Sequence, residues 1–251
     1  LVVKDYRRTV VMVKANDEVS YGVDFFRVRG GDDHLYSFHA QSDEITDVKG
    51  LNLIEQPMGT YAGAAVPYGP DTTQPIGFSW LNHVRRSPAH GSNGFSVEFK
   101  IKDFNRALNK TQDIRLRMTM PAGLYLDEVS LARGYPPQRA ENNSIPYFEY
   151  VLARRKGKDL DTLFTTTFEP YRDKPYLKDI EIVSAERISG KVQPGDEVRA
   201  VKVTHLSGRV DYIIYATNNT VLYRIADLFD FRGFVGVYSL DGDGNPIYSY
   251  I

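Results

Sequence analysis

Strict alternation of apolar and polar residues is the feature that most constrains what this chain can fold into. Residues 95–101 place every second side chain in an apolar set, and residues 114–120 repeat the pattern, with the apolar members Phe95, Val97, Phe99, Ile101, Ile114, Leu116, Met118 and Met120. A period of two is the mark of a β-strand that buries one face and exposes the other. The two segments are therefore predicted to be strands of a half-buried sheet.

The same pattern extends over most of the 251 residues. Further segments rich in β-branched and aromatic residues cover 6–15, 21–30, 129–135, 147–155 and 160–171, and shorter ones follow from residue 179 to the end. Turn sequences such as SGR, NN and DGDGNP separate the shorter segments, so sequence neighbours should pair antiparallel. Helical potential is confined to 103–110 and 225–231, and both are too short to build a layer.

These segments predict an all-β fold with two parts. We expect a large antiparallel β-sandwich, of the supersandwich type, over residues 1–175, because its strands are long and interrupted by large loops. A smaller antiparallel β module is expected over 176–251, where strands are short and closely spaced. Residues 40–93 are dense in Gly and Pro and are predicted to form long loops over the sheet.

Composition excludes several classes of protein. Hydrophobic residues make up 42% and charged residues 25%, as in an ordinary globular protein. The net charge of −1 provides no overall field toward nucleic acid or anionic lipid. The absence of cysteine removes disulfides, thiolate zinc sites and cysteine nucleophiles together. No apolar run approaches the ~18 residues of a membrane helix.

Two histidines five positions apart, His34 and His39, are the first candidates for chemistry. Residues an odd number apart in a strand point to opposite faces, so these two cannot share one metal or one proton. His34 and Tyr36 share a face and are candidates to line a substrate cleft. The alternative is a hydrogen-bonded histidine inside a sandwich.

No compact metal-binding spacing occurs in the sequence, so no metal or cofactor site is predicted in this chain. His83 and His90 lie in the Gly/Pro-rich stretch, and His205 precedes a turn and is expected to be exposed. Residues 241–245 resemble part of a calcium loop, but the acid required at its twelfth position would fall beyond residue 251, so a hairpin turn is predicted.

Basic residues beside an aromatic ring form the second candidate site. Arg85 and Arg86 lie near Trp80 in the predicted loop. Guanidinium groups suit carboxylates and sulfates, and an aromatic ring suits the face of a sugar, so the three are predicted to bind an acidic polysaccharide. Arg115 and Arg117 lie on the polar face of a predicted strand, and for both groups of arginines the alternative is a solvated sheet face whose Lys and Arg residues provide solubility.

The order of several phrases resembles the C-terminal β-region of the heparinase II/III-like polysaccharide lyases. They are DYRRTVVMVKAN, YGVDFFRVRGGDDHLYSFHA, GTYAG, GFSWLNHVRR, FSVEFKI, SLARGYPP and LDTLFTTTFEPY, and together they cover about residues 5–185. In that family an N-terminal helical toroid precedes a β-sandwich, and uronic-acid polysaccharides are cleaved by β-elimination. The resemblance therefore implies an acidic polysaccharide and a helical domain of the same parent protein as partners, and a periplasmic or extracellular location.

The family's catalytic and metal-binding motifs are a His-x-His-x-Asp and a His-Asn-Thr stretch, upstream of the segment that matches here. Neither occurs in this chain, so no catalytic residue is carried over and the chain alone is expected to be inactive, as a fragment or processed portion of a lyase. The parent family's structural metal would likewise be bound upstream.

Two alternatives remain: a freestanding carbohydrate-binding or adhesion module, and a structural β protein of a surface assembly. The upstream sequence of the parent protein would separate them.

Overall fold

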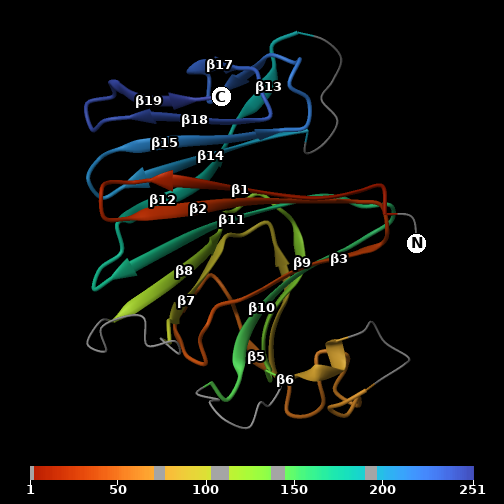
Figure 1. The fold of residues 1–251 in the computed structure, drawn as a ribbon. Helices are drawn as coiled ribbons and strands as arrows, with labels where there is room; N and C mark the ends of the chain where they lie inside the picture. The colour runs from red at the N-terminus through yellow and green to blue at the C-terminus, as the bar shows by residue number, and fades with distance from the viewer. Residues whose placement is uncertain (1–2, 71–76, 103–112, 137–144, 190–196) are drawn as a thin grey trace. The chain divides into compact units, whose positions relative to one another are not determined.

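The computed structural model describes residues 3–70, 77–102, 113–136, 145–189 and 197–251. Strands in antiparallel sheets make up nearly all the regular secondary structure of these residues, which confirms the predicted all-β class (Figure 1). One 3-10 helix, η1, interrupts them. The elements are β1 (Asp5–Lys14), β2 (Ser20–Arg29), β3 (Asp33–His39), β4 (Ile45–Lys49), β5 (Ile54–Glu55), η1 (Phe78–Trp80), β6 (Leu81–Gly91), β7 (Phe95–Lys100), β8 (Ile114–Met120), β9 (Leu126–Gly134), β10 (Phe148–Lys156), β11 (Asp161–Arg172), β12 (Leu177–Val183), β13 (Ala185–Arg187), β14 (Val198–His205), β15 (Val210–Ala216), β16 (Tyr223–Ile225), β17 (Phe229–Phe231), β18 (Val235–Leu240) and β19 (Pro246–Tyr250).

The chain forms two compact units that do not follow one another in sequence. The first unit contains residues 1–30, 119–123 and 161–251, and the second contains 31–118 and 124–160. Each unit therefore combines segments that are separated in the sequence by residues of the other. This division differs from the expected boundary at residue 175, since residues 161–175 fall in the same compact unit as 176–251.

The first unit has three β-layers. The strands β1, β2 and β11 pair in that order, and a five-stranded sheet has the order β12-β14-β15-β18-β19. Between these layers lies a core that includes Val23, Phe25, Leu163, Val201 and Ile213, all fully buried. The opposite face of the five-stranded sheet packs on the small sheet β13-β16-β17, through a core that includes residues of β14, β15, β16 and β17.

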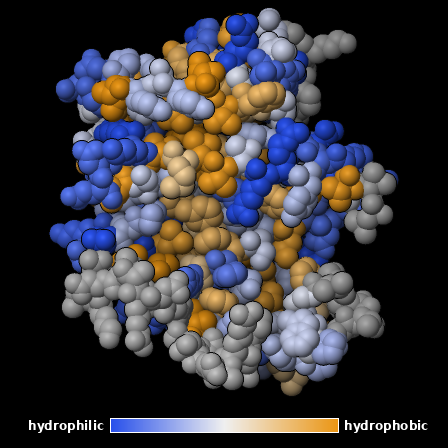
Figure 2. Space-filling view, viewed as in Figure 1, coloured by the Kyte–Doolittle hydropathy of each residue, from blue (hydrophilic) through white to orange (hydrophobic). Residues whose placement is uncertain are grey.

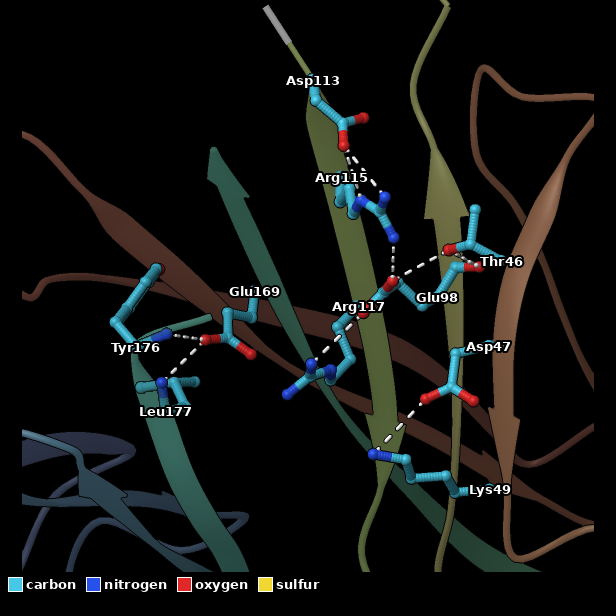
Figure 3. Close-up of polar contacts among 10 residues, drawn as sticks. All are labelled: Thr46, Asp47, Lys49, Glu98, Asp113, Arg115, Arg117, Glu169, Tyr176 and Leu177. Carbon is cyan, nitrogen blue, oxygen red and sulfur yellow. Dashed lines mark hydrogen bonds and ion pairs between the residues drawn. The ribbon is translucent and has the colours of Figure 1, made fainter. Parts of the chain in front are cut away.

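A buried carboxylate connects β11 to β12 within this unit. One carboxylate oxygen of Glu169 accepts hydrogen bonds from the backbone N–H groups of Tyr176 and Leu177, at 2.6 and 2.7 Å (Figure 3). Glu169 is 1% exposed. The first residue of β12 is thus fixed to β11 by charge-assisted hydrogen bonds, which are stronger than neutral ones. These bonds cross the position at which the sequence suggested a boundary.

The second unit contains a five-stranded sheet with the order β3-β10-β9-β6-β5, and the strands β4 and β7 with residues 114–118 of β8. One face of the five-stranded sheet packs Val84, Ala132 and Leu152 around Tyr61, which is 2% exposed. Tyr61 comes from the GTYAG stretch, so a segment with little regular structure supplies a large core side chain.

The predicted loop over residues 40–93 is wrong in part, because β4, β5 and β6 lie within it. The strand β6 pairs with β9, but its register shifts between Asn82 and Arg85 and again between Pro88 and Gly91. His83 and Ala89 have positive φ values of 48° and 51° at these points. Such β-bulges insert extra residues and break the alternation of side chains, which explains why a strand was not recognised from its periodicity.

The helical potential assigned to 225–231 is also wrong, whereas 103–110 lies outside the described residues. Residues 225–231 form the end of β16, a turn and β17, with Ile225 paired to Phe229. Ala226 and Asp227 in the turn have φ values of 50° and 57°. Consecutive left-handed residues end any helix and suit the tight turn of a hairpin.

The predicted hairpin turn at 241–245 is confirmed. A carboxylate oxygen of Asp241 accepts hydrogen bonds from the backbone N–H groups of Asp243 and Asn245, at 3.0 and 2.8 Å. The strands on either side, β18 and β19, pair antiparallel.

Candidate functional site: an arginine pair beside a row of aromatic rings

Two arginines of the second unit share one buried carboxylate. Nη2 of Arg85 donates to Oε2 of Glu149 at 3.3 Å, and Nε of Arg133 donates to Oε1 at 2.9 Å. Glu149 is 3% exposed, whereas the two arginine side chains are about one-third exposed. A buried carboxylate therefore holds two solvent-accessible guanidinium groups side by side.

Strand pairing explains why these three residues meet. Arg133 of β9 lies directly opposite Glu149 of β10, and Arg85 of β6 lies opposite Leu131 of β9. Residues opposite each other across a strand pair point to the same face, and so do residues two apart in one strand. Arg85, Arg133 and Glu149 thus share one face of the sheet.

The arginine pair borders a small pocket, here termed the polar pocket. Its volume is about 310 Å³, and its lining residues are Glu55, Gln56, Pro57, His83, Val84, Arg85 and Arg133. Burial lowers the pKa of Arg133, but the hydrogen bond and the charge of Glu149 outweigh it, so the net shift of that pKa is upward. Both arginines are cationic at any physiological pH.

Four aromatic rings, here termed the aromatic row, lead from Trp80 to the arginine pair. Tyr68 lies 5.2 Å from Trp80 and 5.7 Å from Tyr135, both edge-on, and Tyr135 lies 6.3 Å from Tyr147. The guanidinium of Arg133 stacks over Tyr147 at 4.3 Å. Trp80, Tyr68 and Tyr135 are 44–45% exposed, so the row presents aromatic surface to solvent beside a pair of carboxylate-binding groups.

Of the predicted site residues, the structure brings Trp80 and Arg85 to this site but separates Arg86 from them. Arg86 donates to Glu128 at 2.7 Å and to the backbone oxygen of Tyr61 at 3.0 Å, and its guanidinium lies 4.9 Å from the ring of Tyr61. Because residues 81–91 form a strand and not a loop, the neighbours Arg85 and Arg86 point to opposite faces. Arg86 belongs to the packing around Tyr61.

His34 and Tyr36 do not line this site. The predicted parity of β3 holds, since both are buried while Ser37 and His39 on the other face are exposed. His34 is 3% and Tyr36 is 1% exposed. Side chains this deeply buried offer no surface to a polymer, which corrects the expectation that they line a cleft.

Sequence reasoning missed Arg133, Glu149, Tyr68 and Tyr135. Arg133 and Tyr135 are two apart at the end of one predicted strand, and Tyr147 and Glu149 are two apart at the start of the next. Antiparallel pairing of those strands places the two pairs together. The sequence alone indicates which residues lie on the same face of a strand, but it does not indicate which strands pair with each other.

A second polar cluster lies in the first unit, around the fully buried carboxylate of Asp211. Tyr21 donates to Oδ2 of Asp211 at 2.7 Å, Nε2 of His205 lies 2.7 Å from the same oxygen, and Nε of Arg209 donates to Oδ1 at 2.8 Å. His205 is 4% exposed, so the expectation that it is exposed was wrong. Val201, Val203 and His205 share one face of β14, and that face packs in the core.

Within the described ranges no group of three or more His, Cys, Asp or Glu residues is arranged to hold a metal ion. Among those same residues no helix has the length and apolar character needed to span a membrane. The chain matches no protein-family model and no curated protein.

Proposed function

We propose that this chain is the non-catalytic β-sandwich portion of a heparinase II/III-like polysaccharide lyase, where it walls the cleft for an acidic, uronic-acid-containing polysaccharide. The helical domain of the same parent protein would carry the base for β-elimination, and this portion would brace that domain. Such a lyase would act in the periplasm or outside the cell, where polymeric glycans are found. The all-β fold and the order of the sequence motifs support this proposal.

The observation that carries the proposal is the continuity between the aromatic row and the arginine pair. Exposed aromatic rings provide apolar area for contact with sugar rings, at little cost in side-chain entropy. A guanidinium group binds a planar carboxylate by donating two parallel N–H hydrogen bonds to its oxygens. Apart from Glu149, no described residue accepts a hydrogen bond from the side chain of Arg85 or Arg133, so guanidinium donors remain for a ligand.

Affinity electrophoresis and calorimetry with polyuronate chains test this function. We expect the chain to bind them at low salt and Tyr68→Ala to weaken binding by about three- to tenfold, the value of one aromatic contact. Tyr125→Ala is the matched control, because Tyr125 is 51% exposed in the same unit but has no ring contact with the row. Equal losses in both variants, or no binding by the unaltered chain, would contradict the proposal.

Catalysis is tested separately, through the ultraviolet absorbance of the unsaturated sugar that β-elimination produces. The chain alone is expected to give no increase above buffer, because it contains neither of the family's histidine motifs. Sustained turnover by the purified chain would show that the base lies within these 251 residues.

A further inference from the structure

Resting on the proposed function, we infer that the site takes polyuronates that carry carboxylates but no sulfate groups. The reason is the charge balance of the polar pocket and of the residues around it. Sulfated chains bind proteins mainly through an excess of Lys and Arg, with counterion release and steep salt dependence, as other polyanions do. The described part of the second unit lacks such an excess.

Charges in the polar pocket cancel. Arg85 and Arg133 contribute two positive charges, and Glu149 beneath them contributes one negative charge. Glu55, an exposed lining residue, contributes a second negative charge. Binding must then depend on guanidinium hydrogen bonds and on ring contacts, which suit one carboxylate at a time and not a dense array of anions.

Other arginines of the second unit are also matched to carboxylates. Arg115 and Arg117 of β8 both bond to Glu98 of β7, at 2.8 and 3.2 Å, and Arg115 also bonds to Asp113 (Figure 3). Glu98 is 6% exposed. The basic face predicted for these strands is therefore neutralised from within the sheet.

Two further arginines of the second unit are also paired with carboxylates. Arg86 pairs with Glu128 and Arg154 pairs with Asp33. On the face shown in Figure 2, hydrophobic residues lie among the hydrophilic ones. Among the described residues of the second unit, Lys and Arg do not outnumber Asp and Glu, so a heavily sulfated polymer meets no excess of positive charge there.

The test compares one oligouronate with the same oligouronate after chemical sulfation, by calorimetry at low and at physiological salt. We expect the unsulfated form to bind at least as tightly, with a shallow dependence on salt. Tighter and steeply salt-dependent binding of the sulfated form would overturn this inference and leave the proposed function standing. Binding of neither form would overturn the proposed function, and the inference with it.

Glu149 is the positioning residue whose charge sets this preference. Glu149→Gln keeps the size of the side chain and removes one negative charge beneath both arginines. We expect binding of the sulfated oligomer to tighten by about three- to tenfold in this variant and to become more salt-dependent. Glu186→Gln is the control, since it changes the net charge equally at an exposed residue of the first unit.

If Glu149→Gln and Glu186→Gln changed the affinity for the sulfated oligomer equally, the proposed role of Glu149 would be contradicted, because the effect would then come from net charge alone. Thermal unfolding of both variants establishes that they are folded. If Glu149→Gln does not fold, the comparison of the two oligomers on the unaltered chain still decides the inference.

Discussion

Asp211 illustrates how the surroundings of a single residue fix its role. Burial raises the pKa of this carboxyl, but hydrogen bonds from His205, Ser239, Tyr21 and Arg209 outweigh it, so the net shift is downward. Burial also raises the pKa of Tyr21, which keeps its hydroxyl a donor to Asp211. A histidine, an aspartate and a tyrosine in contact could suggest catalysis, but in this protein they lie inside a core and stabilise it.

The stability of the first unit should therefore depend on the charge of Asp211. A carboxyl with a lowered pKa in the folded state stabilises the fold above its unfolded pKa of about 3.9, and the contribution is lost as the pH falls through the folded value. Asp211→Asn should lower the free energy of unfolding at neutral pH by about 3 kcal/mol, since Arg209 loses a buried partner. Urea unfolding at neutral pH and below pH ~4 measures both effects.

Asp243→Asn is the matched control, because Asp243 is exposed in the turn before β19. It should leave the urea midpoint nearly unchanged. If Asp211→Asn loses as much stability on acidification as the unaltered chain does, Asp211 is not the titrating group.

At the scale of elements, strand parity and bulges together decide which side chains meet. The regular strands β3, β9 and β10 present the residues that their alternation predicts. In β6 two register shifts interrupt the alternation, so that Arg85 and Arg86 could be assigned to opposite faces only once the pairing with β9 was known. Left-handed residues mark these irregularities, as they mark the turn between β16 and β17.

Replacing Ala226 by glycine tests the free-energy cost of a left-handed residue that is not glycine. A left-handed conformation costs a non-glycine residue about 1–2 kcal/mol, of which glycine's larger loss of entropy on folding offsets a part. Ala226→Gly should therefore raise the free energy of unfolding by about 0.5 kcal/mol. Urea midpoints of the two proteins provide the measurement.

Ala200→Gly provides the contrast, because Ala200 is fully buried in a regular strand of the same core. It should destabilise the chain by about 1 kcal/mol. A loss of the same size in Ala226→Gly would mean that the turn is not strained by its alanine.

At the scale of the molecule, core formation and not chain order defines the compact units. The core between β1-β2-β11 and the five-stranded sheet combines residues near the N-terminus, such as Val23, with Val201 and Ile213 far along the chain. The hydrophobic effect rewards buried area irrespective of sequence separation. A boundary drawn from strand length near residue 175 could not reveal this.

Residues 176–251 produced alone should consequently fail to form a stable native fold. They would expose Leu177, Val201 and Val203, which the β1-β2-β11 layer covers in the whole chain. Each buried aliphatic side chain contributes roughly 1.5–3 kcal/mol, so these three approach the 5–15 kcal/mol of a typical domain. Near-ultraviolet circular dichroism and binding of a hydrophobic dye, compared with the whole chain, measure the outcome.

A monomeric 176–251 fragment with a cooperative urea transition at the midpoint of the whole chain would contradict this expectation. It would show that the five-stranded sheet needs only the small β13-β16-β17 sheet to be stable.

The sequence by itself determined the all-β class, the faces of the regular strands and the hairpin turn at 241–245, because alternation and turn chemistry act between near neighbours. The sequence also led to the prediction that Trp80 and Arg85 belong to one site, and the structure brings both to the aromatic row and the arginine pair. The tertiary structure alone decided that Arg133 and Glu149 join Arg85, that Arg86 turns away, and that His34, Tyr36 and His205 are buried. These outcomes depend on which strands pair and which faces are covered, and both are set by contacts between residues far apart in the chain.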